Sequence, residues 1–111
     1  MAYDLNGKII LVTGGATGIG FSCIKEILRA GAQAVTIADI NELKGEVAVK
    51  DITKEFGPNR AVFVKTDVTN AEQFENAFKK TIQIWKGIDV LINNAGVLND
   101  ADWELEIAIN A

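Results

Sequence analysis

The sequence has no histidine and only one cysteine, one proline and one methionine among its 111 residues. Without histidine, a catalytic relay built on an imidazole is excluded. Cys23 cannot form an internal disulfide, and with no second cysteine and no histidine the chain lacks the ligands of a zinc site. We therefore expect neither a structural metal nor a disulfide.

Basic clusters and long apolar runs are also absent. Fifteen acidic residues outnumber eleven basic ones, giving a net charge of -4, which argues against nucleic acid or an anionic membrane as the main partner. The apolar run at residues 9–12 is shorter than the roughly 7–15 residues of a secretory signal core and the roughly 20 of a membrane span. The length and the 49% hydrophobic content predict one globular, soluble and cytoplasmic domain, with Cys23 as a core thiol.

Short β-branched segments alternate with longer amphipathic segments along the chain. The short segments predict buried strands, at residues 9–13, 34–38, 61–65 and 88–92. The longer segments predict helices, at residues 18–30, 41–56 and about 69–87, with a last helix from about Trp103. This order predicts an α/β fold over residues 1–111: a partial, Rossmann-like, doubly wound parallel sheet of strand order 3-2-1-4, truncated after the fourth strand and part of the next helix.

Particular residues mark the expected helix ends. Gly31 is expected to stop the first helix, and Asn41 to cap the second. Thr69 and Glu72 have the spacing of a capping box for the third helix, which Gly87 is expected to close.

In this strand order, the loops after the first and fourth strands flank one crevice, at residues 13–20 and 93–98. The first loop reads T-G-G-A-T-G-I-G between a strand and a helix. Glycine allows close approach of a diphosphate to backbone amides, and a helix N-terminus favours negative charge. A purely structural turn is the alternative, because the spacing is not G-x-G-x-x-G. The cofactor-binding candidates are Thr13, Gly14, Thr17, Gly18, Ile19 and Gly20.

Acidic residues follow the second and third strands. Asp39 lies nineteen residues after Gly20, where a carboxylate is expected to bind the ribose 2′-hydroxyl and to repel a 2′-phosphate. This favours NAD over NADP, although Asp39 could simply form a turn. Asp67 and Val68 are candidates for the adenine pocket, but Asp67 and Thr69 could equally serve only to cap the next helix.

The fourth strand ends in Asn93-Asn94-Ala95-Gly96. Two adjacent asparagines after an apolar run are costly unless they are hydrogen-bonded, so their side chains are expected to tie this strand to its neighbours. Small residues at Ala95 and Gly96 would leave room for a cofactor. A plain turn is again the alternative. The candidates here are Asn94, Ala95 and Gly96.

Taken in order and at this spacing, the first loop, Asp39, Asp67-Val68 and residues 93–96 resemble the N-terminal half of a short-chain dehydrogenase/reductase. Residues 88–97 and 102–110 are most similar to insect alcohol dehydrogenases and NAD-dependent hydroxyprostaglandin dehydrogenases. The resemblance implies NAD as cofactor and a small alcohol or ketone as substrate. It also implies a homo-oligomer for the full-length form, and a catalytic role for Asn110, which would hold a water beside a lysine.

The same resemblance implies a catalytic Ser, Tyr and Lys beyond Asn110. The only tyrosine here is Tyr3, and no Tyr-x-x-x-Lys occurs. We therefore expect a fragment that binds NAD but is inactive alone. Two alternatives are a nucleotide-binding module without chemistry and an interaction fragment that pairs through an open edge of the fourth strand.

Overall fold

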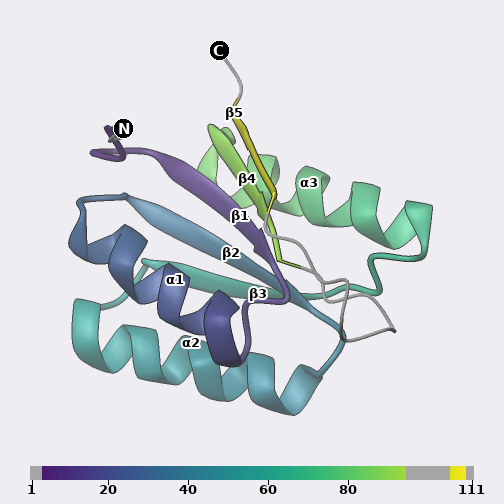
Figure 1. Cartoon of the computed structure of the whole chain (residues 1–111), viewed down its shortest axis with the longest axis horizontal. Coiled ribbons are helices and arrows are strands. Elements are labelled where there is room, and N and C mark those ends of the chain that lie inside the picture. Colours follow the sequence, from purple (N-terminus) through teal and green to yellow (C-terminus); the bar gives the residue numbers. More distant parts are fainter. Residues whose placement is uncertain (1–3, 95–105, 110–111) are drawn as a thin grey trace.

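The computed structural model describes residues 4–94 and 106–109. Its elements are β1 (Ile9–Thr13), α1 (Gly18–Arg29), β2 (Ala34–Asp39), α2 (Glu42–Phe56), β3 (Ala61–Lys65), α3 (Ala71–Trp85), β4 (Val90–Asn93) and β5 (Glu106–Ile109). They form one sheet of order β3-β2-β1-β4-β5, in which the first four strands are parallel (Figure 1). The predicted Rossmann-like order 3-2-1-4 is confirmed.

Helices cover both faces of the sheet, α1 and α2 on one side and α3 on the other (Figure 1). Ile10 and Val12 of β1 pack into the core with α1 and α2, whereas Leu11 between them packs with Ala77 and Phe78 of α3. Successive strand residues point to opposite faces, so β1 is fully buried along its length. This explains the unbroken apolar sequence of the strand.

Helix α1 presents an apolar stripe to the sheet. Ile24, Ile27 and Leu28 are buried, and the half-buried Cys23 packs at the edge of the same core. Burial raises the pKa of the Cys23 thiol, which keeps it protonated at neutral pH. Ile19 lies outside this stripe and is 54% exposed.

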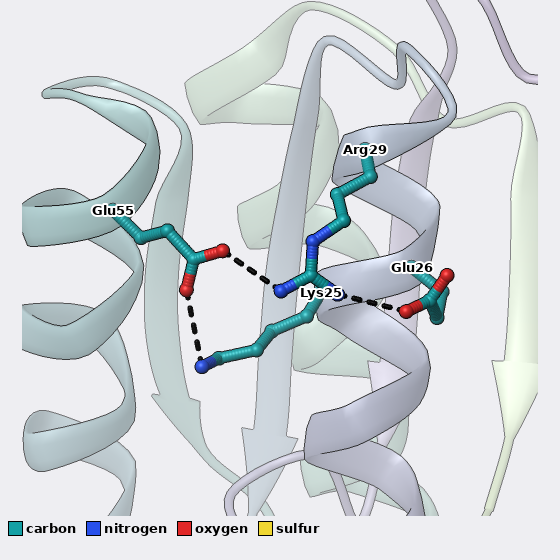
Figure 2. Close-up of polar contacts among 4 residues, drawn as sticks. All are labelled: Lys25, Glu26, Arg29 and Glu55. Atoms are coloured by element: carbon teal, nitrogen blue, oxygen red, sulfur yellow. Dashed lines mark hydrogen bonds and ion pairs between the residues drawn. The ribbon is translucent and has the colours of Figure 1, made fainter.

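The two outer helices on one face are joined by an ion network (Figure 2). Glu55 of α2 accepts from Lys25 at 3.1 Å and from Arg29 at 2.9 Å, and Arg29 also pairs with Glu26 at 2.7 Å.

No helix in the described part of the chain is long and apolar enough to cross a bilayer.

Two predicted caps on α3 are wrong by one residue. Asn70 rather than Thr69 is the N-cap, since its side chain accepts from the backbone N–H groups of Glu72 and Gln73. Thr69 instead donates its hydroxyl to Asp67. At the other end Lys86, in the left-handed conformation with φ 71°, closes the helix before Gly87 is reached.

The last predicted helix is wrong where the structure describes it. Residues 106–109 form β5, which pairs antiparallel with β4 from Val90↔Ile109 to Asn93↔Glu106. A short helix with no packing partner is marginal, whereas the free backbone groups along β4 offer a ladder to a neighbouring strand. The expected open edge of β4 is therefore covered, and pairing of another chain at that edge is not supported.

Candidate functional site

The loop between β1 and α1 depends on two glycines with positive φ. Gly14 has φ 64° and Gly18 has φ 61°, a region that residues with a Cβ avoid. The N–H of Gly14 donates to the carbonyl of Ala38 at 2.7 Å, so the loop leaves the sheet beside the end of β2.

Close packing behind the loop requires two further glycines. A Cβ on Gly15 would lie 2.8 Å from Cδ1 of Ile24, and a Cβ on Gly20 would overlap the Gly14 carbonyl and lie 2.6 Å from Nδ2 of Asn94. Helix α1 can therefore begin directly against the strand ends only because these positions lack side chains. The glycines shape a tight cradle at the carboxyl edge of the sheet.

The N-terminus of α1 is open at the front of this cradle. Thr17 is the N-cap but makes no capping side-chain hydrogen bond, and the first turn contains no acidic residue. Thr17, Gly18 and Ile19 are exposed, and a Cβ built on Gly18 would have no neighbour within 4 Å. Backbone N–H groups at a helix N-terminus favour an anion, so the cradle can accept a phosphate group.

Polar side chains join the ends of β1 and β4. The hydroxyl of the fully buried Thr13 donates to Oδ1 of Asn93 at 2.6 Å and accepts from the N–H of Asn94 at 2.9 Å. Nδ2 of Asn94 also donates to the Gly14 carbonyl at 3.4 Å. The two asparagines thus tie β4 to its neighbour, as expected. The Thr13 side chain is engaged in this scaffold, and its contact with a cofactor stays a prediction.

Asp39 lies half-buried at the end of β2, next to the loop. Its Oδ1 accepts from the N–H of Asn41 at 3.0 Å, and its Oδ2 accepts from the N–H of Ala16 at 3.1 Å. Its carbonyl accepts from the N–H of Thr66 at 2.8 Å. Asp39 therefore connects the glycine loop, the start of α2 and the end of β3.

Asp67 lies two residues after the end of β3 and interacts with Thr69. The hydroxyl and the N–H of Thr69 both donate to Oδ1 of Asp67, at 2.6 and 3.0 Å, and these bonds hold the pKa of the Asp67 carboxyl below its usual value. The two residues bond to each other ahead of α3 and do not cap it, because Asn70 is its N-cap. Contact of Asp67 or Val68 with adenine stays a prediction.

The structure brings most of the predicted site residues to one edge of the sheet, around residues 13–20, Asp39, Asp67 and Asn94. Ala95, Gly96 and Asn110 lie outside the described residues. Sequence reasoning missed the role of the Ala16 amide. A signal was present, since an aspartate two residues before Asn41 can form a local turn that fixes its carboxylate.

The chain is similar to known proteins. The family profile described as short chain dehydrogenase matches residues 8–111, and the chain belongs to that family. It is 37% identical over 106 residues to the bovine (Bos taurus) protein named 15-hydroxyprostaglandin dehydrogenase [NAD(+)], covering 96% of this chain and 40% of the relative. It is also 42% identical over 101 residues to (+)-cis,cis-nepetalactol synthase NEPS3 of Nepeta racemosa, covering 91% of this chain and 36% of that protein.

Solved structures share the fold. A short-chain dehydrogenase/reductase of Burkholderia phymatum in complex with NAD matches with a TM-score of 0.79 at 24% identity, over 86% of this chain and 33% of that one. A short-chain type dehydrogenase/reductase of Mycobacterium marinum matches with a TM-score of 0.77 at 31% identity, over 86% and 38%. The chain thus spans about 40% of the length of these relatives or less.

Proposed function

We propose that this chain binds NAD and forms the dinucleotide-binding part of an oxidoreductase that acts on the CH–OH group of a secondary alcohol. The observation that carries the proposal is the cradle around Gly20, where a side chain would strike the Gly14 carbonyl and Asn94. Such close backbone packing beneath an open helix N-terminus suits a diphosphate.

The residues present fit the chemistry of each part of the dinucleotide. The exposed amides at residues 17–19 would hold the diphosphate, and Asp39 would accept from the adenosine ribose hydroxyls. Asp67 and Val68 are proposed for the adenine side. Asn94, with Ala95 and Gly96 after it, is proposed for the nicotinamide side.

Charge favours NAD over NADP at this site. Asp39 carries a carboxylate where the 2′-phosphate of NADP would lie, and like charges at short range repel. The loop positions Gly15, Ala16 and Thr17 offer no cation to offset that repulsion. The name of the bovine relative, which specifies NAD(+), agrees with this preference.

When bound, NAD would accept a hydride from the alcohol carbon. Within residues 1–111 there is no Tyr-x-x-x-Lys sequence, so we propose that the groups that move the hydroxyl proton come from elsewhere in a longer form, with Asn110 beside them. We therefore expect negligible turnover from the 111 residues alone. Similarity to a hydroxyprostaglandin dehydrogenase supports a secondary alcohol as substrate.

A second candidate function is nucleotide binding without chemistry. It is favoured by the same lack of a Tyr-x-x-x-Lys sequence within these residues. An assay that mixes an alcohol and NAD with the 111-residue chain and records NADH absorbance tests this second candidate. Formation of NADH would exclude binding without chemistry, and it would also contradict the inactivity that we expect of the 111 residues.

Calorimetric titration tests the binding proposal. NAD is expected to bind the wild-type chain at least about tenfold more tightly than NADP, a difference of roughly 1.4 kcal/mol. Gly14→Val places a branched side chain at φ 64° and should abolish binding, whereas Gly87→Ala, at a position with open space and no such φ, should preserve it. Absence of NAD binding by the wild-type chain would refute the proposal.

A further inference from the structure

Asp39 has a second relationship to the loop besides its proposed contact with ribose. Its two carboxylate oxygens are both engaged in the structure, Oδ1 by Asn41 N–H at 3.0 Å and Oδ2 by Ala16 N–H at 3.1 Å. The Asn41 bond is local, spanning two residues, whereas the Ala16 bond spans twenty-three. The longer-range bond joins β2 to the middle of the glycine loop.

Two contacts hold the loop at Ala16, one made by its side chain and one by its backbone N–H. Its side chain is only 6% exposed and belongs to the core beneath α1 and α2, and its N–H points to Asp39. The next three residues, 17–19, are exposed. The loop therefore changes from anchored to solvent-facing directly after the residue that Asp39 holds.

We propose that Asp39 is a positioning residue for the diphosphate cradle: its Oδ2 fixes the Ala16 amide and so preorganises residues 17–19 before nucleotide binds. The inference rests on the proposed function and deepens it. Preorganisation lowers the ordering cost of binding, so the carboxylate would strengthen binding of a diphosphate that it does not touch. An Ala16 N–H that donates to Asp39 is also not free to donate to that diphosphate.

A ligand without ribose separates the two roles of Asp39. Inorganic pyrophosphate cannot use a contact between Asp39 and ribose. Removing a negative charge near the cradle should strengthen pyrophosphate binding through electrostatics alone, while loss of preorganisation should weaken it. A double-mutant cycle isolates the loss of preorganisation. The charge effect of Asp39→Ala is the same whether or not the Ala16 N–H donor is present, so it cancels in the cycle.

The second change in the cycle removes only the donor. Cys23 permits ligation of a synthetic 1–22 thioester to residues 23–111, so the Ala16 amide can be replaced by an ester while Asp39 stays intact. We expect the ester to weaken pyrophosphate binding about two- to tenfold, the range for one lost hydrogen bond. Asp39→Ala in the ester background should cause no further loss, so the cycle should be non-additive.

Amide hydrogen exchange in the ligand-free chain provides an independent measure. Asp39→Ala should accelerate exchange at Ala16 about two- to tenfold, but leave unchanged the Gln33 amide, which donates to the Lys8 carbonyl at 2.8 Å. Unchanged exchange at Ala16, or an additive cycle, would overturn the positioning role while NAD binding by the wild-type chain stands. Absence of both NAD and pyrophosphate binding would overturn the proposed function and the coupling together.

Discussion

The buried Thr13 hydroxyl donates to Oδ1 of Asn93 at 2.6 Å, so the side chains of two neighbouring parallel strands meet where both strands end. Oγ1 of Thr13 also accepts from the N–H of Asn94. One threonine therefore holds the start of the glycine loop against the end of β4. We place the dinucleotide at this edge of the sheet.

Thr13→Val should destabilise the fold. Valine has nearly the shape of threonine but leaves the half-buried Asn93 and Asn94 groups without their partner, at a cost of about 1–3 kcal/mol. Urea denaturation measures the loss, and Thr13→Ser, which keeps the hydroxyl, should recover most of it. Equal stability of the Val and wild-type chains would show that this junction is not held by the hydroxyl.

Gly20→Ala should impair NAD binding as well as stability. The added Cβ would overlap the Gly14 carbonyl and approach Nδ2 of Asn94, so the cradle must widen, at a typical overpacking cost of about 1–3 kcal/mol. Calorimetry should show NAD affinity lowered at least about tenfold. Gly87→Ala is the matched control, and equal losses in both variants would contradict the assigned role of Gly20.

Gly45→Ala tests how α2 rests on β3. In an exposed helix this change gains about 1 kcal/mol, but here the new Cβ would overlap the Phe63 ring and lie 2.7 Å from its Cζ. We therefore expect a net loss of stability in thermal unfolding. In a Phe63→Leu background, the same alanine should become neutral or stabilising, and a loss that persists there would exclude the ring as the cause.

The ion network between α1 and α2 should make stability depend on pH in the acid range (Figure 2). Hydrogen bonding with Lys25, followed by that with Arg29, lowers the pKa of Glu55. A carboxylate whose pKa is depressed on folding contributes stability above its unfolded pKa, about 4.3 for Glu, and loses it as pH falls through the folded value.

Comparison of the wild-type chain with Glu55→Gln tests whether ionised Glu55 stabilises the fold. The stability difference between the wild-type and variant chains should be present at pH 7 and should shrink below about pH 4. High salt should reduce it as well, because Glu55 and Arg29 are exposed and Lys25 is only partly buried. A difference that does not change with pH would exclude the ionised carboxylate as its source.

The sequence predicted the parallel core because its signals are local and consistent. Residues 9–12 are apolar on successive positions, and Gly31 and Asn41 are strong boundary residues. The helix predicted to include residues 106–109 is wrong, because a four-residue segment containing two isoleucines has no period that separates a helix from a strand. The conformation of residues 106–109 is determined by their pairing with the edge of β4, which lies elsewhere in the sequence.

The candidate site was predictable in its location but not in its internal bonds. Parallel topology brings the ends of β1, β2 and β4 to one edge, so Gly14, Asp39 and Asn94 could be grouped from the strand pattern alone. The bond from Ala16 to Asp39 depends on the loop path, which the positive φ angles of Gly14 and Gly18 determine. A pattern of residue types does not specify that path.

The most direct test of the account is to locate NAD on the chain by amide chemical shifts of ¹⁵N-labelled protein. Saturating NAD is predicted to shift the amides of residues 14–20 and 39–41 most strongly, with little change at Glu46, Lys50 and Phe63, which line a separate groove beside β3. The largest shifts at that groove, or no shifts anywhere, would contradict the claim that the glycine cradle binds the dinucleotide.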